Sequence, residues 1–285
     1  MKKIFRINSI SDLHLEFDDK GNLPEFKFSE NIDFLILAGD IITSSRKGVP
    51  EYYTDWILNL QKYAKHIIYV PGNHEYYNGR RDKFARIVKE RFKNTNVHFL
   101  LNESVVLDGI RFVGTDLWTD AKLDAHHENS LLLREQDVKL KFTRNKDFKH
   151  ITVKKNGFRK LSFVDRLNWH YEAKNFILKE LNNSVEPVIL ITHHGISKEQ
   201  LSSEKYTSDT NYFYVSDIVD EILDTKNPPI YHFSGHNHQF KKGKLKGKLP
   251  FLINSRGYND VDEYGDSYLI SEYQSDHLIE LKVDF

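Results

Sequence analysis

Residues 67–75 read IIYVPGNHE, in which a short apolar run rich in β-branched side chains leads directly into a turn with glycine, carboxamide, imidazole and carboxylate groups. Apolar runs of about four to eight residues with turn residues behind them are typical of buried strands. The same pattern recurs along the chain. The other early and central runs are Ile4–Ile10, Phe34–Ala38, Arg111–Gly114, Val188–Thr192 and Ile230–Ser234.

Helical patterns separate some of these runs. Tyr52–Lys65, Arg81–Phe92 and Phe163–Leu181 carry apolar side chains at helical spacing. After residue 230 the pattern turns to short strands, at Pro250–Asn254, Tyr268–Tyr273 and Leu278–Val283. Alternation of strands and helices predicts an α/β protein whose functional loops gather at the carboxyl ends of the strands.

Composition narrows the chemistry of any site. The 285 residues include no cysteine and 14 histidines, and Lys+Arg equals Asp+Glu at 41 each. The absence of cysteine excludes disulfide scaffolds, thiol catalysis and Cys-ligated zinc or iron–sulfur sites. A net charge of zero argues against binding nucleic acid through bulk charge. A metal site in this chain must be built from His, Asp, Glu and Asn.

The sequence contains nothing that resembles a targeting or membrane segment. No apolar stretch approaches the ~18 residues that a membrane span needs. The apolar part of the amino-terminal segment is too short and too interrupted for a signal peptide. We therefore expect a cytoplasmic protein with no membrane partner, whose oligomeric state the sequence leaves open.

The middle of the chain is different in character. Between about 121 and 160 the apolar runs thin out, and residues 139–160 hold nine Lys or Arg against one Asp. We predict one domain over residues 1–285 with a basic insertion at about 121–160. Such a charge run is usually a solvated hairpin. The functional alternative is a rim that attracts anionic substrate.

Five polar blocks each follow a predicted strand. They are Asp12-Leu13-His14, Gly39-Asp40, Gly72-Asn73-His74-Glu75, His193-His194 and Gly235-His236-Asn237-His238. The carboxyl ends of strands in an open α/β sheet converge on one crevice, so these groups are expected to meet there.

Spacing adds a second argument. In Asp12-x-His14 and His236-x-His238 the side chains are two apart, and an extended backbone would point both to the same side. Glycines at 39, 72 and 235 would let the backbone turn sharply and approach an ion closely. With one His taken from the His193-His194 pair and His74 left aside, the set offers four imidazoles, two carboxylates and one carboxamide. Seven ligands are too many for one tetrahedral ion and suit two divalent ions sharing a bridge.

The ordered blocks resemble the calcineurin-like metallophosphoesterase superfamily. They span residues 12–238 and occur in the order of that superfamily. Leu117-Trp118 after Gly114-Thr115-Asp116, the charged insertion and the helix with His170 are similar to a bacterial and phage subset described as phosphoesterases. The resemblance implies a four-layer αββα sandwich of two mixed β-sheets flanked by helices, with a dinuclear metal site at the carboxyl ends of the strands.

Matching motif to motif, the resemblance implies a role for each group. One metal would be held by Asp12, His14 and His238, and the other by Asn73, His193 and His236. Asp40 would bridge both ions, and His74 would face the leaving group as the catalytic residue. His194 lies beside a presumed ligand and is the weaker choice for that position. Mixed nitrogen and oxygen donors tolerate Mn²⁺, Fe, Zn²⁺, Ni²⁺ or Co²⁺, of which Mn²⁺ is favoured.

The implied activity is hydrolysis of a phosphodiester or phosphomonoester by a hydroxide that bridges the two ions. A phosphorylated small molecule or nucleotide is the leading substrate. A nuclease acting on DNA or RNA is the nearest alternative, since the lysines of 241–248 and the basic insertion could attract it and Tyr76-Tyr77 could stack bases. A catalytically silent, metal-bearing interaction protein is the alternative outside enzymes. Residues 41–44 read IITS and lack the arginine of protein phosphatases, which disfavours that activity.

Overall fold

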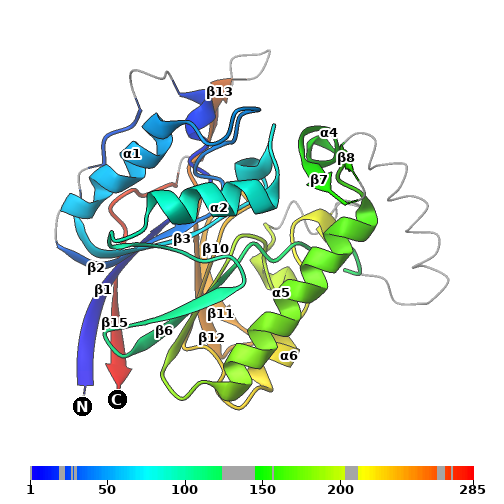
Figure 1. Cartoon of the computed structure of the whole chain (residues 1–285). Coiled ribbons are helices and arrows are strands. Elements are labelled where there is room, and N and C mark those ends of the chain that lie inside the picture. The colour runs from blue at the N-terminus through cyan, green and yellow to red at the C-terminus, as the bar shows by residue number, and fades with distance from the viewer. Residues whose placement is uncertain are drawn as a thin grey trace.

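The computed structural model describes residues 2–18, 23–26, 28, 31–123, 145–155, 157–202, 211–261, 267–270 and 272–285. Two β-sheets lie face to face, with α1 and α2 over one and α5 and α6 over the other (Figure 1). The α/β class and the four-layer arrangement expected from the sequence are therefore confirmed. The described helices are α1 Glu51–Asn59, α2 Arg81–Arg91, α4 Lys146–His150, α5 Phe163–Asn183 and α6 Val219–Leu223.

The first sheet has the strand order β15-β1-β2-β3-β4. The strands β1 to β4 run parallel, and β15 pairs antiparallel with β1, so the two chain ends lie side by side in Figure 1. The bounds are β1 Lys2–Ile10, β2 Ile32–Ala38, β3 Ala64–Val70, β4 Val97–Phe99 and β15 Leu278–Asp284.

The second sheet has the order β11-β12-β10-β9-β6-β5. Its central strands β12, β10, β9 and β6 are parallel, whereas β11 and β5 close the two edges in antiparallel pairs. The bounds are β5 Glu103–Leu107, β6 Ile110–Thr115, β9 Val188–Thr192, β10 Tyr231–Ser234, β11 Phe240–Leu245 and β12 Leu249–Asn254. Two small antiparallel pairs complete the described strands, β7 Thr152–Lys154 with β8 Phe158–Lys160 and β13 Gly257–Val261 with β14 Ser267–Leu269.

The apolar runs are continuous because both faces of the strands are buried. In β2, Phe34 and Ile36 face the core between the two sheets, whereas Leu35 and Leu37 face the core beneath α1 and α2. In β9, Ile189 and Ile191 similarly enter the core between the sheets. Burying each such side chain contributes about 1.5–3 kcal/mol relative to exposure. Because successive side chains of a strand enter opposite cores, each central strand stabilises both the packing of helices on its sheet and the packing of the two sheets on each other.

Some helix and strand boundaries differ from the sequence prediction. The helix predicted over Tyr52–Lys65 ends earlier, because Ala64 and Lys65 begin β3 and Ala64 pairs with Ile32. Pairing within a central parallel sheet outweighs the helical pattern at that point. The strand predicted over Tyr268–Tyr273 ends at Leu269. The short edge strands β4, β5 and β11 and the strand β13 were not predicted.

The basic segment is described in part. Residues 145–155 and 157–160 form α4 and the β7–β8 hairpin, and residues 124–144 lie outside the described residues. The boundaries 121–160 of an insertion within one domain therefore remain a prediction. Among the helices of the described ranges, none has both the length and the apolar character needed to cross a membrane.

Candidate metal centre

The five polar blocks meet at one edge of the two sheets. Asp12, Asp40 and Asn73 follow the carboxyl ends of β1, β2 and β3, and the second sheet contributes the loops after β9 and β10. Backbone hydrogen bonds join neighbouring loops, from the Asp12 amide to the Gly39 carbonyl (2.9 Å) and from the His14 amide to the Asp40 carbonyl (3.0 Å). The convergence expected at the strand ends is what the fold produces.

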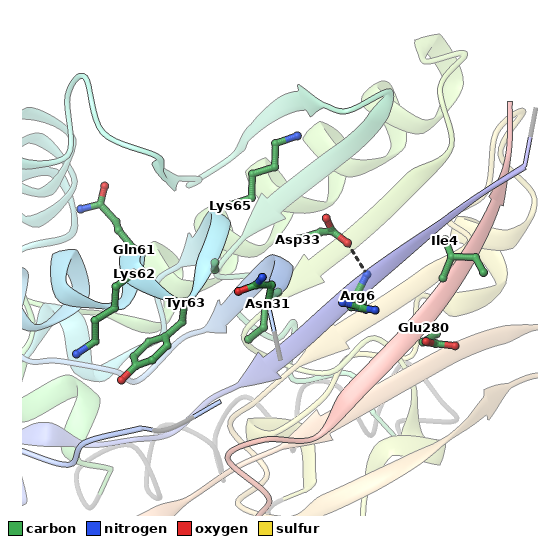
Figure 2. Close-up of a pocket in the computed structure, with 11 residues that line it drawn as sticks. Ile4, Arg6, Asn31, Asp33, Gln61, Lys62, Tyr63, Lys65 and Glu280 are labelled. Carbon is green, nitrogen blue, oxygen red and sulfur yellow. Dashed lines mark hydrogen bonds between the residues drawn. The ribbon is translucent and has the colours of Figure 1, made fainter. Parts of the chain in front are cut away.

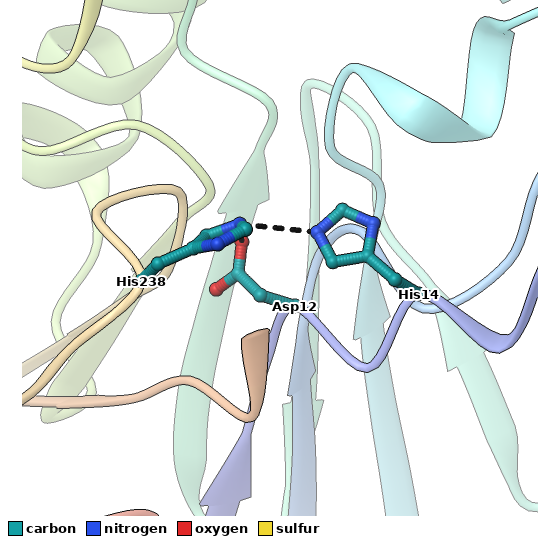
Figure 3. A group of neighbouring side chains, drawn as sticks. All are labelled: Asp12, His14 and His238. Atoms are coloured by element: carbon teal, nitrogen blue, oxygen red, sulfur yellow. Dashed lines mark hydrogen bonds and ion pairs between the residues drawn. The ribbon is translucent and has the colours of Figure 1, made fainter. Parts of the chain in front are cut away.

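The first group of donor atoms comprises Asp12, His14 and His238 (Figure 3). Nε2 of His14 lies 3.1 Å from Nε2 of His238, and Nε2 of His238 lies 3.5 Å from Oδ1 of Asp12. The hydroxyls of Ser11 and Ser255 each donate to Oδ2 of Asp12 at 2.6 Å. The Asp12 carboxylate is therefore fixed by two hydroxyls and still faces the two imidazoles.

The second group comprises Asp40, His193 and His236. Oδ1 of Asn73 lies 3.2 Å from Nε2 of His193, which brings the amide oxygen to the same place. Nδ1 of His193 contacts the carbonyl of Ala38 at 3.0 Å, so its Nε2 carries the free lone pair when the ring is neutral. All seven side chains predicted as ligands thus fall into two adjacent groups.

Asp40 lies between the two groups. Its Oδ2 is 3.3 Å from Nε2 of His193 and 3.9 Å from Nε2 of His14, whereas its Oδ1 accepts the backbone amide of His74 at 2.8 Å. Burial alone would raise the pKa of this carboxyl, but His193 and His74 outweigh it and hold the pKa well below its usual range. Asp40 is consequently a buried carboxylate with one oxygen directed at both groups.

The local backbone differs from the extended form expected for the two paired motifs. Asp12 has φ 52°, His14 has φ 48°, and His236 and His238 have φ 66° and 44°. These are left-handed conformations that non-glycine residues adopt at a cost of about 1–3 kcal/mol. Asp12 and His14 share the first group, whereas His236 and His238 belong to different groups. Left-handed turns and not strand geometry aim these side chains, so the prediction from extended spacing was wrong.

Two glycines are required by close contacts. A Cβ on Gly72 would lie 2.3 Å from Oδ1 of Asp40 and 2.6 Å from Nε2 of His193. A Cβ on Gly39 would lie 2.3 Å from Nδ1 of His193, and Gly39 also has φ 88°. Both glycines therefore leave the room that the donor groups occupy.

Glu75 is a central residue of the site that the sequence reasoning did not single out. Its buried carboxylate accepts the backbone amides of Asp40 (2.9 Å), Ile41 (2.8 Å) and Gly72 (2.7 Å). Burial and the neighbouring Asp40 raise the pKa of Glu75 to about 7. Glu75 ties the loop after β2 to the loop after β3. Its place at the end of the GNHE block was the available signal.

His74 lies beside both groups and is held by Glu16. Nδ1 of His74 is 2.7 Å from Oε1 of Glu16, and the same oxygen lies 3.3 Å from Nδ1 of His14. Burial lowers the pKa of His74, but Asp40 and Glu16 outweigh it and raise that pKa to about 9. Burial similarly opposes ionisation of Glu16, yet hydrogen bonds from His14 and His74 lower its pKa to about 2. Sequence reasoning missed Glu16, which is 58 residues from His74 in the chain.

Two other candidates have structural partners. His194 directs Nδ1 to the Asp116 carbonyl at 3.0 Å and packs against Trp118, and it belongs to neither group. Tyr76 is fully buried and donates its hydroxyl to Asp116 at 2.9 Å, so it cannot stack a base. Tyr77 stacks on the ring of His74, with centroids 4.1 Å apart.

The segment that lacks the phosphatase arginine is part of the scaffold. Ile41 and Ile42 are fully buried, and Thr43 and Ser44 donate their hydroxyls to the carbonyls of His74 and Glu75. These residues hold the GNHE loop through hydrogen bonds, and none of them has a positively charged side chain that could bind a phosphate.

A separate pocket lies at the opposite ends of the strands (Figure 2). It has a volume of about 580 Å³ and is lined from the amino ends of β1, β2 and β3, where the Arg6 amide donates to Asp33 at 2.8 Å. Its lining, among the described residues, includes none of the donor groups. This pocket is therefore not the candidate site.

Comparison with known proteins assigns the fold and the motifs to a family. The sequence pattern of the calcineurin-like phosphoesterases matches residues 5–240. This chain belongs to the calcineurin-like phosphoesterase family. The family resemblance expected from the ordered motifs is confirmed.

Two relatives and one solved structure are similar to this chain. Protein L509 of Acanthamoeba polyphaga mimivirus is 28% identical over 270 residues, which are 88% of this chain and 90% of L509. A metallophosphoesterase of Helicobacter pylori strain 26695 is 29% identical over 118 residues, 40% of this chain and 30% of that protein. The solved phosphopantetheinyl hydrolase of Mycobacterium tuberculosis is similar with a TM-score of 0.64 at 18% identity, over 88% of this chain and 89% of that one. At that identity the likeness shows the fold alone.

The donor set fits divalent metal ions. In each group one carboxylate oxygen and two imidazole nitrogens lie within 4.8 Å of one another, and Oδ1 of Asn73 lies 3.2 Å from Nε2 of His193 in the second group. Burial lowers the pKa of His193, yet Asp40 and Asp12 reverse this and raise it to about 10. The carboxylates of Asp40 and Asp12 thus favour positive charge beside His193, and the same carboxylates would attract a metal cation.

Proposed function

We propose that this chain is a metal-dependent phosphoesterase with a dinuclear centre. Asp12, His14 and His238 would hold one divalent ion, and Asn73, His193 and His236 would hold the other. The position of Asp40 carries this proposal, since its Oδ2 lies 3.3 Å from His193 and 3.9 Å from His14 and can serve both groups.

Two divalent ions held by these residues would supply positive charge for the phosphoryl oxygens and would make water a nucleophile near neutral pH. The chain's own contribution begins with His74, which is 6% exposed and adjoins both donor groups. Its Nδ1 is directed to Glu16, so Nε2 is the nitrogen that can give a proton or a hydrogen bond to a leaving oxygen. Glu16 thereby keeps the ring in one orientation.

The metal identity follows from availability more than from the donors. Mixed imidazole, carboxylate and amide ligands accept Mn²⁺, Fe, Zn²⁺, Ni²⁺ or Co²⁺. We propose Mn²⁺, which this set of four imidazoles, two carboxylates and one amide accepts.

A small or nucleotide-like phosphoester is the proposed substrate class. Phe17 is 41% exposed and packs against the edge of Tyr258, with centroids 5.2 Å apart. The ring of Tyr258 in turn lies 4.3 Å from the ring of His14 and 4.6 Å from that of His238. These two aromatic residues form a wall beside the donor groups that supports an organic group with a flat face.

Nucleic acid is less favoured than a small substrate. Two lysines of the run 241–248 already have partners within the protein. Lys241 donates to the carbonyls of Glu199 and Leu201, and Lys246 pairs with Asp220. A catalytic efficiency on an oligonucleotide that falls steeply from roughly 50 to 300 mM salt would instead favour the nuclease.

The deciding experiment measures hydrolysis of p-nitrophenyl phosphate and bis(p-nitrophenyl) phosphate by the full chain with added Mn²⁺. A chelator should abolish the activity, and Mn²⁺ should restore it. A chain that binds two ions per molecule and hydrolyses neither ester would be a silent metal-bearing protein and would overturn the proposal.

A further inference from the structure

Asp147, the only acidic residue between positions 139 and 160, contacts a proposed metal ligand. Oδ1 of Asp147, in α4, accepts the amide Nδ2 of Asn73 at 2.9 Å and the hydroxyl of Tyr77 at 2.7 Å. Asp147 is 8% exposed, although the segment 139–160 to which it belongs otherwise carries nine Lys or Arg. This buried carboxylate constrains how the side-chain amide of Asn73 is oriented.

An ionised carboxylate only accepts hydrogen bonds, so it selects the NH₂ side of the Asn73 amide. The amide oxygen must then face the opposite way, and it does, at 3.2 Å from Nε2 of His193. A rotated amide would present NH₂ to the donor group and could not coordinate a cation. We propose that Asp147 is a positioning residue that orients Asn73 for the second metal ion, an inference that rests on the proposed function.

The fold holds Asp147 in place from both sides. Asn145 caps α4 by accepting the Asp147 amide at 2.8 Å. The loop after β3 is joined to α4 and β7 by backbone hydrogen bonds from Asn78 to the His150 carbonyl and from Thr152 to the Gly79 carbonyl, both 3.0 Å. The segment is therefore fastened to the loop that carries Asn73 at several points.

The same carboxylate reaches the proposed catalytic histidine through Tyr77. The Tyr77 ring stacks on His74 with centroids 4.1 Å apart and an interplanar angle of 28°, and on its other neighbour His150 with centroids 5.3 Å apart. By accepting the Tyr77 hydroxyl, Asp147 fixes the ring against which His74 packs. Part of the segment predicted as a solvated hairpin or a substrate rim thus supports the metal centre from outside.

The test is a Mn²⁺ titration of the metal-depleted full chain by calorimetry, with Asn73→Ala and His14→Ala identifying the two sites. Asp147→Ala should weaken the site of Asn73, His193 and His236 by about 10–100-fold, the usual effect of losing a residue that orients a ligand. The site of Asp12, His14 and His238 should keep its affinity. Asp147→Asn, which retains an acceptor oxygen, should recover most of the loss.

Asn145→Ala is the matched control. It removes the α4 cap, at a cost of about 1 kcal/mol, but leaves the Asp147 carboxylate. If Asn145→Ala weakened Mn²⁺ binding as much as Asp147→Ala, docking of α4 and not orientation of the amide would be responsible, and the inference would be wrong. Unchanged Mn²⁺ affinity in Asp147→Ala would overturn it too.

Activity gives an independent readout. The Mn²⁺ concentration for half-maximal hydrolysis should rise by about 10–100-fold in Asp147→Ala, with a much smaller change at saturating Mn²⁺. A merely structural role would lower the melting temperature and leave the half-maximal concentration unchanged. Failure of the wild-type chain to bind any of Mn²⁺, Fe, Zn²⁺, Ni²⁺ or Co²⁺ would refute the proposed function itself. Unchanged metal binding and activity of Asp147→Ala, in an enzyme that is active with two ions, would refute only this inference.

Discussion

Nδ1 of His74 lies 2.7 Å from Oε1 of Glu16, and the two residues come from different loops of the first sheet. The contact holds one nitrogen of the imidazole and leaves the other for a substrate. It also joins the loop after β3 to the loop after β1 next to the donor groups. This pair gives the first prediction.

His74→Ala should retain both metal ions and lose about 10²–10⁴-fold in kcat on an alkyl phosphodiester. The loss should be smaller for p-nitrophenyl esters, whose leaving group needs less protonation. Glu16→Gln should fall between wild type and His74→Ala, because the ring remains but its orientation is less defined. Metal content and kcat on both esters check this, and wild-type rates of His74→Ala on the alkyl ester would contradict it.

Asp40→Ala should lose bound metal and activity together. The change removes the one oxygen directed at both His193 and His14 and leaves those imidazoles without their shared acidic neighbour. Metal analysis after dialysis is the measurement, with the surface variant Asp82→Ala as the control. Two ions retained per chain would show that Asp40 is not the bridge.

Gly72→Ala should abolish metal binding in a chain that still folds. Its Cβ would lie 2.3 Å from Oδ1 of Asp40, which must then move away from the donor groups. Gly243→Ala is a suitable control, since its Cβ would only approach the Phe251 ring at 3.2 Å. Circular dichroism and a Mn²⁺ titration separate folding from binding, and wild-type affinity would count against the close-approach argument.

Phe17→Ala should raise KM for aryl or nucleotide phosphoesters by about tenfold, since stacking on one aromatic side chain is worth about 1–3 kcal/mol. KM for a simple alkyl phosphoester should change little. Phe158→Ala, at a 68% exposed position on β8, is the matched control. Equal changes in KM for aryl and alkyl esters would exclude the aromatic wall as a specificity element.

Asp165 should make stability depend on pH. A hydrogen bond from Arg159 lowers the pKa of Asp165. Burial raises this pKa, but hydrogen bonds from Ser162 lower it further, and the result is a pKa of about 2. The unfolded value is about 3.9, so the stabilisation is present above about pH 4 and is lost as the pH falls towards 2. Asp165→Asn should cost about 1–2 kcal/mol at pH 7, and urea unfolding at pH 7, 4 and 3 should show the difference from wild type shrinking. A difference independent of pH would assign the effect to helix capping alone.

Local patterns in the sequence were sufficient for the central strands and for placing the proposed donor residues in the loops that follow them. Phe34–Ala38 is apolar throughout because it is buried on both faces, and this continuity identifies a central strand without any knowledge of its neighbours. The polar blocks were recognisable because each directly follows such a strand. Strand ends converge in any open α/β sheet, so Asp12, Asp40 and Asn73 could be placed together from order alone.

Only the tertiary structure decided which residues orient the donors. Asp147 is 74 residues from Asn73, and Ser255 is 243 residues from Asp12, so no local pattern joins them. The left-handed turns at Asp12 and His14 could not be predicted from the sequence either, because the surrounding fold and not the intrinsic preference of these residues imposes them. The sequence by itself determined the chemistry of the donor set, since side-chain types are local. Its orientation depended on contacts between distant segments, which exist only once the two sheets have packed.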